Sequence, residues 1–231
     1  MEPPKSNPSL LETTLLLGSL TSALAYGLVV RAPPSRSRMV YKTASTALLS
    51  CLAASRTSSS SSSSSSPLVV AALALSSAGD AFLAWSGEEA FLRGLGSFLV
   101  AHLLYCVVLW RSGNGIRADD HGWRRSVAAL SVVAAPAMSF ALLPRVGPAL
   151  RLPIVLYCTA ILSMLLGAVT VRGSQVATGA VLFALSDSLL ATEQFLLDSE
   201  SRHRVWMQYA VWALYYSGQL LIVTGLRRNG A

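Results

Sequence analysis

Long apolar stretches recur from one end of the chain to the other, and they constrain its fold more than any other feature. A helix needs about 20 predominantly apolar residues to cross a hydrocarbon core of about 30 Å. The stretches that are long enough, or nearly so, lie near residues 10–30, 39–55, 68–86, 91–110, 126–143, 149–170, 176–197 and 205–225. They are continuous and lack the alternating pattern of membrane barrel strands. We therefore expect an all-α, polytopic membrane protein with about eight transmembrane helices.

Charged residues are too scarce for a soluble protein of this length. Asp, Glu, Lys and Arg make up 13% of the 231 residues, against roughly 25% in an average soluble domain. The connections between apolar stretches are short, so neighbouring helices should lie antiparallel in one compact bundle, a single domain over residues 1–231. The exception is a serine-rich segment at 56–67, which we interpret as a flexible loop.

The net charge of +7 raises the question of nucleic-acid binding. DNA-binding domains gather Lys and Arg on one face or along one helix. Here the basic residues form short groups between apolar stretches, such as Arg124–Arg125 and Arg227–Arg228. This pattern is typical of loops beside anionic lipid headgroups, so we expect no nucleic-acid partner. Because Lys and Arg divide evenly between the two sides, the positive-inside rule leaves the orientation open.

Two carboxylates lie within apolar stretches, where polar side chains are costly and often mark a functional site. Asp80 occurs in SSAGDAFLAW and Asp187 in GAVLFALSDSLLA. A helical rise of 1.5 Å per residue places Asp80 about 9 Å and Asp187 about 15 Å inside the same side of the membrane. We hypothesise that polar groups of several spans meet in one cavity opening towards that side. The further candidates are Lys42, His102, Tyr105, Tyr209, Trp212, Tyr216 and Gln219.

These residues also have purely structural interpretations. An aspartate in a span can pair with a lysine or a serine and fix helix packing. A buried, neutral His102 can bridge two helices. The stripe of Tyr209, Trp212 and Tyr216 is more typical of packing than of chemistry, because aromatic side chains supply large contact areas.

Three segments, taken in order, resemble the signatures of the YhhN/TMEM86 lysoplasmalogenase family. The first comprises residues 76–85 with the later AHLLY at 101–105. The second is GAVLFALSD at 179–187, and the third is YYSGQLLI at 215–222. The resemblance runs from about Lys42 to Ile222 and implies a membrane-embedded hydrolase. Its substrate would be a lysoplasmalogen, whose vinyl ether bond it would cleave to a fatty aldehyde and glycerophosphocholine or glycerophosphoethanolamine.

The residue chemistry is compatible with that reaction, and the expected catalytic residues are Asp80 and Asp187. Vinyl ether hydrolysis needs a proton on the β-carbon and then water on the α-carbon of the resulting oxocarbenium ion. One protonated and one ionised carboxylate can divide these tasks. The deeper Asp187 is the expected proton donor, although the sequence leaves the assignment open. The expected substrate-binding or supporting residues are Lys42, Ser76, His102, Tyr105, Tyr216 and Gln219.

We expect neither a cofactor nor a metal, because no metal-ligand cluster is visible in the sequence. The expected partners are a lysophospholipid substrate and membrane lipids, with a homo-oligomer left open, and the expected location is the endoplasmic reticulum membrane. A proton-coupled membrane transporter would also use intramembrane Asp and His. Such a transporter should show repeated halves or broken helices, and the sequence has no convincing repeat. A purely structural scaffold would leave the two deep aspartates unexplained.

Overall fold

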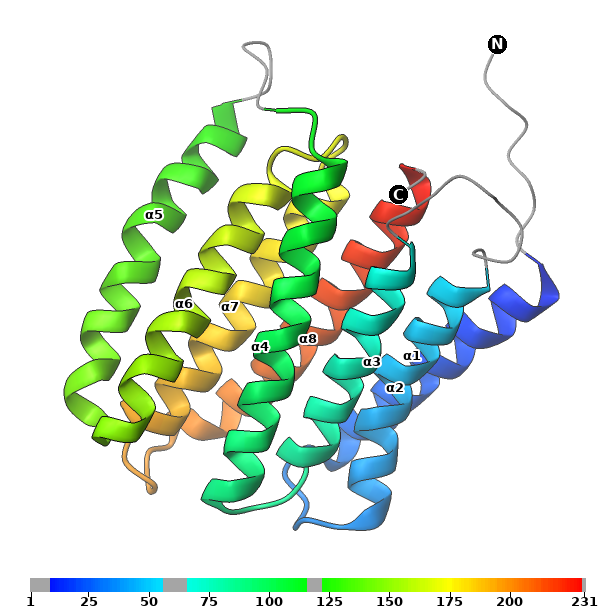
Figure 1. The fold of residues 1–231 in the computed structure, drawn as a ribbon. Helices are drawn as coiled ribbons and strands as arrows, with labels where there is room; N and C mark the ends of the chain where they lie inside the picture. Colours follow the sequence, from blue (N-terminus) through cyan, green and yellow to red (C-terminus); the bar gives the residue numbers. More distant parts are fainter. Residues whose placement is uncertain (1–8, 56–65, 116–121, 230–231) are drawn as a thin grey trace.

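A computed structural model describes residues 9–55, 66–115 and 122–229 (Figure 1). These residues form eight α-helices and a short 3-10 helix, and they contain no strand, which confirms the expected all-α fold. The elements are α1 (Leu10–Val29), α2 (Arg36–Ala54), α3 (Ser66–Leu83), α4 (Glu88–Ser112), α5 (Gly122–Leu142), η1 (Leu143–Arg145), α6 (Pro148–Ala168), α7 (Gln175–Phe195) and α8 (His203–Arg228).

The helices differ from the expected spans by a few residues because capping and turn residues set their ends. The Ser35 side chain accepts a hydrogen bond from the Arg38 backbone and starts α2 three residues before the apolar stretch. After α3, Gly87 has a positive φ of 115° that favours glycine, and it turns the chain into α4. The serine-rich loop expected at 56–67 lies mostly outside the described residues. Its last two residues, Ser66 and Pro67, instead begin α3, where a proline costs no hydrogen bond.

Four helical segments are long and apolar enough to cross a membrane: α4, α5 together with η1, α6 and α7. α3 contributes a shorter apolar helix from Pro67 to Leu83. These segments support a membrane protein, while the count of eight transmembrane helices stays a prediction. Among the four, α5 is the least buried inside the bundle.

Consecutive helices run in alternating directions and form one bundle (Figure 1). The first four pack in chain order, α4 also packs on α6, and α5 lies at the outer edge against α6. α7 and α8 form the most extensive pair, and α8 returns to contact α1 and α2. An ion pair between Glu12 and Arg227 joins the start of α1 to the end of α8, so both lie at the same end of the bundle.

Two glycines allow α7 and α8 to approach closely. A Cβ atom on Gly179 would lie 2.8 Å from the carbonyl oxygen of Gly218, and a Cβ on Gly218 would lie 2.8 Å from the carbonyl oxygen of Gly179. The two backbones therefore touch where any side chain would separate them. The same two helices carry Asp187 and Tyr215.

Candidate active site

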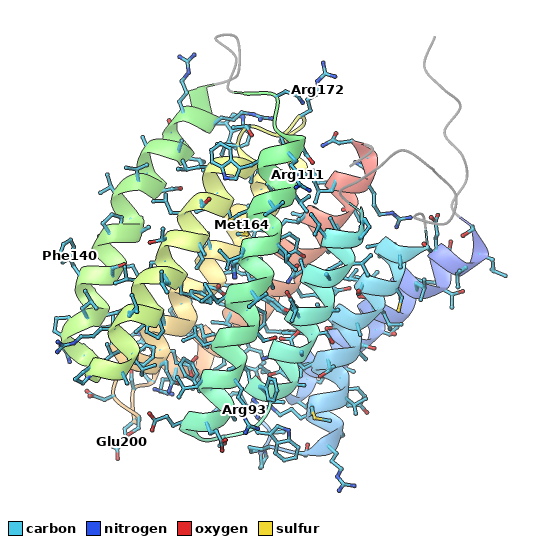
Figure 2. The ribbon with its side chains drawn as sticks, in the orientation of Figure 1. Arg93, Arg111, Phe140, Met164, Arg172 and Glu200 are labelled. Carbon is cyan, nitrogen blue, oxygen red and sulfur yellow. The ribbon has the colours of Figure 1, made fainter. Side chains whose placement is uncertain are left out.

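A cavity of about 850 Å³ lies inside the bundle and is lined by residues of all eight α-helices. It reaches the α3–α4 connection at residues 85–87, and we call this end of the bundle the site end. Figure 2 shows Arg93 and Glu200 at the site end, with Arg111 and Arg172 at the opposite end. Asp80, Asp187 and Lys42 all line this cavity.

Asp80 is held by donors from two neighbouring helices. Its side chain is buried, and its Oδ2 atom accepts hydrogen bonds of 2.8 Å from the hydroxyls of Thr46 and Tyr215. The Nζ atom of Lys42 lies 3.5 Å from Oδ1 and forms an ion pair. Two donors and an ammonium group suit an ionised carboxylate, because each of them favours the negative charge.

Asp187 has a different environment. Its Oδ2 atom accepts a 2.8 Å hydrogen bond from the Tyr157 hydroxyl on α6. The same oxygen lies 3.5 Å from Nε2 of His102 on α4. One hydroxyl and one imidazole surround it, in place of the lysine that Asp80 has.

The hydrogen-bonding role of His102 follows from its second ring nitrogen. Nδ1 lies 2.7 Å from the backbone carbonyl oxygen of Phe98, which can only accept, so Nδ1 carries a hydrogen. In the neutral ring Nε2 is then an acceptor, and this atom is buried with no hydrogen-bond partner while it faces Asp187. A single proton, carried by Asp187 or by His102, would complete a hydrogen bond between them.

An aromatic cluster joins the surroundings of the two aspartates. The ring of Phe183 lies 5.4 Å from that of Tyr215 and 4.8 Å from that of His102, measured between centroids. Phe98 lies 5.7 Å from Tyr215, and His102 lies 5.1 Å from Tyr157. Tilted and edge-on contacts of this kind fix ring positions, so the donors to both carboxylates share one packed framework.

Several residues expected near the aspartates make other contacts. The Tyr105 hydroxyl donates a 2.6 Å hydrogen bond to Gln219 and links α4 to α8. The Tyr216 hydroxyl lies 2.7 Å from that of Ser19 on α1. Ser76 donates to the Ala72 carbonyl of its own helix. None of these residues is among the described residues that line the cavity, and neither is His102.

Sequence reasoning missed three hydroxyl groups and one cation of the site. Thr46, Tyr157 and Tyr215 donate to the aspartates, and Arg38 lines the cavity beside Lys42. Tyr157 could have been identified as a candidate from the sequence, because it is a polar residue inside an apolar stretch. Tyr215 was hidden by its neighbour Tyr216, which completes the more obvious helical stripe.

The fold and the site define a class: helical membrane proteins with two carboxylates, one buried and one half-buried, that line a cavity between the helices. The sequence profile of the YhhN family matches residues 37–226, which include both aspartates, and the chain belongs to this family. No solved structure is a significant match.

Curated relatives of this chain come from bacteria and mammals. A protein named lysoplasmalogenase from Mycobacterium tuberculosis is 29% identical over 218 residues, which cover 88% of this chain and 80% of the relative. Lysoplasmalogenase TMEM86B from Homo sapiens is 32% identical over 163 residues, covering 70% of this chain and 64% of the relative. The Sus scrofa protein of the same name is 36% identical over 151 residues, covering 65% and 59%.

Proposed function

We propose that this protein is a membrane-embedded lysoplasmalogenase, which hydrolyses the vinyl ether bond of lysoplasmalogens to a fatty aldehyde and a glycerophospho-alcohol. The names of its relatives support this activity. The observation that carries the proposal is the pair of unlike carboxylates on one cavity, Asp80 beside an ammonium group and Asp187 beside an imidazole.

Asp187 acts as the proton donor in this proposal. A proton on Oδ2 can point at the bare Nε2 of His102, and Tyr157 can still donate to the same oxygen. When substrate enters, the proton moves from Asp187 to the β-carbon of the vinyl ether, and the double bond becomes an oxocarbenium ion. A positioned acid of this kind contributes about 10²- to 10⁴-fold in rate.

Asp80 acts as the ionised partner. Its negative charge, fixed by Lys42 and two hydroxyl donors, stabilises the oxocarbenium ion and accepts a proton from the attacking water. Water adds to the α-carbon and gives a hemiacetal. The hemiacetal breaks into the aldehyde and the free glycerol hydroxyl when Asp80 returns its proton to the ether oxygen and the hemiacetal hydroxyl gives its proton back to Asp187. The hydroxyl oxygen of glycerol is therefore the original ether oxygen.

The shape of the cavity supports a single-chain lipid as substrate. Apolar residues of α5 line it from Val127 to Leu142, a distance of about 22 Å along the helix. Facing them are apolar residues of α6 such as Ile154 and Ile161. This apolar arm suits a hydrocarbon chain, while the cations of α2 at the other side of the cavity suit the glycerophosphate. The endoplasmic reticulum location and a homo-oligomeric state stay predictions.

The test is aldehyde release by the detergent-purified protein in deuterium oxide. Alkenyl-lysophosphatidylcholine and alkenyl-lysophosphatidylethanolamine are the substrates, the 1-acyl lysolipids are the controls, and borohydride traps the aldehyde as it forms. We expect one deuterium on the carbon next to the carbonyl carbon. In water labelled with oxygen-18, we expect no label in the glycerol product. If neither of the two alkenyl lipids yields aldehyde, the proposed function is overturned.

A further inference from the structure

We infer that Arg38 binds the phosphodiester of the lipid substrate, and that Lys42 serves Asp80 instead. The inference rests on the proposed function and names the contact that selects a phospholipid over an uncharged ether lipid. Both cations belong to α2, one helical turn apart, and both line the cavity. The difference between them lies in what each already contacts.

Lys42 has a partner. Its Nζ atom lies 3.5 Å from Asp80 Oδ1, so the lysine charge offsets the charge of a carboxylate that is almost completely buried. A phosphate that drew Lys42 away would leave Asp80 with an uncompensated charge, which is costly in the interior. Lys42 is therefore better suited to hold Asp80 ionised than to hold the substrate.

The guanidinium of Arg38 has hydrogen-bond donors that no described residue of the protein uses. Its Nη1 atom donates a 3.3 Å hydrogen bond to the Ala84 carbonyl, and its guanidinium carbon lies 6.0 Å from the ring centroid of Tyr26. Its Nε atom is buried without a hydrogen-bond partner. No carboxylate in the described part of the chain forms an ion pair with Arg38. A partly buried guanidinium with free donors is the group that proteins use to bind phosphate.

The position of Arg38 fits the covalent structure of the substrate. It precedes Lys42 by four residues and lies about 6 Å nearer the start of α2, which is at the site end. Lys42 lies beside Asp80, and in the proposed mechanism the vinyl ether reacts at Asp80. The glycerol carbons separate the ether oxygen from the phosphate, so a lipid with its ether at Asp80 directs its phosphate towards Arg38. The positive end of the α2 helix dipole adds to the attraction.

The experiment compares two substrates that differ by the phosphocholine headgroup: an alkenyl-lysophosphatidylcholine and the corresponding 1-alkenylglycerol, which has no phosphodiester. The variants are Arg38→Gln, Arg38→Lys and Arg36→Gln, and the last is the matched control because it removes the same charge from an exposed residue of the same helical turn. The measured quantity is the ratio of the two kcat/KM values. Thermal unfolding in detergent reports whether each variant is folded.

We expect Arg38→Gln to lower the substrate ratio about 10- to 100-fold, chiefly through KM of the phospholipid, which is the range for a hydrogen bond to a charged group. Arg38→Lys should retain part of the preference, and Arg36→Gln should leave the ratio unchanged. Arg38 does not bind the phosphate if Arg38→Gln and Arg38→Lys both keep the wild-type ratio. This includes the case in which a variant lowers both activities by the same factor. If millimolar inorganic phosphate raises alkenylglycerol cleavage to the phospholipid rate, the site takes a free anion instead. A wild-type protein that cleaves neither substrate overturns the proposed function and this inference together.

Discussion

The Nε2 atom of His102 lies 3.5 Å from Oδ2 of Asp187, with Nδ1 of the same ring committed to the Phe98 carbonyl. One proton, carried by either side chain, would form a hydrogen bond between the two. Asp80 has the opposite surroundings, since each of its contacts brings a proton or a positive charge. The two carboxylates thus have different hydrogen-bonding roles, although both lie in apolar helices.

Removing either carboxylate should abolish most of the activity. Asp187→Asn cannot deliver the proton, and Asp80→Asn cannot carry the charge that stabilises the cation. Each should lower kcat for aldehyde release about 10²- to 10⁴-fold. The measurement uses folded, detergent-purified variants and an alkenyl-lysophosphatidylcholine. Near-wild-type turnover by one variant would show that its carboxylate is not essential.

His102 should act as a positioning residue for Asp187. We expect His102→Gln to lower kcat about 10-fold or more, because the imidazole that orients the proton of Asp187 is lost, while KM changes little. The solvent deuterium isotope effect on kcat should increase, since proton transfer becomes more fully rate-limiting. Tyr105→Phe is the control on the same helix face, because it removes the hydrogen bond to Gln219 and leaves the contacts of Asp187 intact. Equal effects of both variants on kcat and on the isotope effect would indicate a purely structural role for His102.

The adjacent tyrosines of α8 provide a matched pair. Tyr215→Phe removes a donor to Asp80, so it should lower kcat about 10- to 100-fold, the range for one hydrogen bond to a charged group. Tyr216→Phe removes the contact with Ser19 and should lower stability by about 1 kcal/mol with little change in kcat. Steady-state kinetics and thermal unfolding separate the two effects. The reverse pattern, with Tyr216 controlling turnover, would contradict the assignment.

The all-α fold was predictable because apolar stretches of helical length recur along the chain, and four helical segments are long and apolar enough to cross a membrane. The membrane aspartates were predictable for the same reason, since a charge in an apolar run is visible without any neighbour. The Lys42–Asp80 ion pair is different, because it joins α2 to α3 and depends on the rotation of both helices. Helical spacing shows which residues share a face, but not which helix that face meets.

Two adjacent residues of α8 show most clearly which contacts the sequence alone does not predict. Tyr215 and Tyr216 differ by one position, or about 100° around the helix, and they contact α3 and α1 respectively. The sequence favoured Tyr216 because it continues the spacing of Trp212 and Gln219. α8 approaches α7 closely at Gly179 and Gly218, and helical spacing alone does not predict this contact between distant parts of the sequence.

That contact leads to a prediction about stability and activity together. Gly218→Ala places a Cβ 2.8 Å from the Gly179 carbonyl oxygen and 2.9 Å from the Phe183 backbone nitrogen, and backbone atoms cannot rotate away as a side chain can. The helices must separate, at a cost of about 1–3 kcal/mol. For a chain of this length that corresponds to a fall in melting temperature of about 2–4 °C per kcal/mol. Turnover should fall as well, because α7 carries Asp187 and α8 carries Tyr215.

The control is Gly96→Ala on α4, where an added Cβ meets no atom within 4 Å. The same chemical change there should leave turnover unaltered. It should slightly raise the melting temperature, because alanine has a higher helix propensity than glycine. Thermal unfolding and aldehyde release are measured on both variants in one detergent. If Gly218→Ala matches Gly96→Ala in both assays, the close approach of α7 and α8 does not set the geometry of the site.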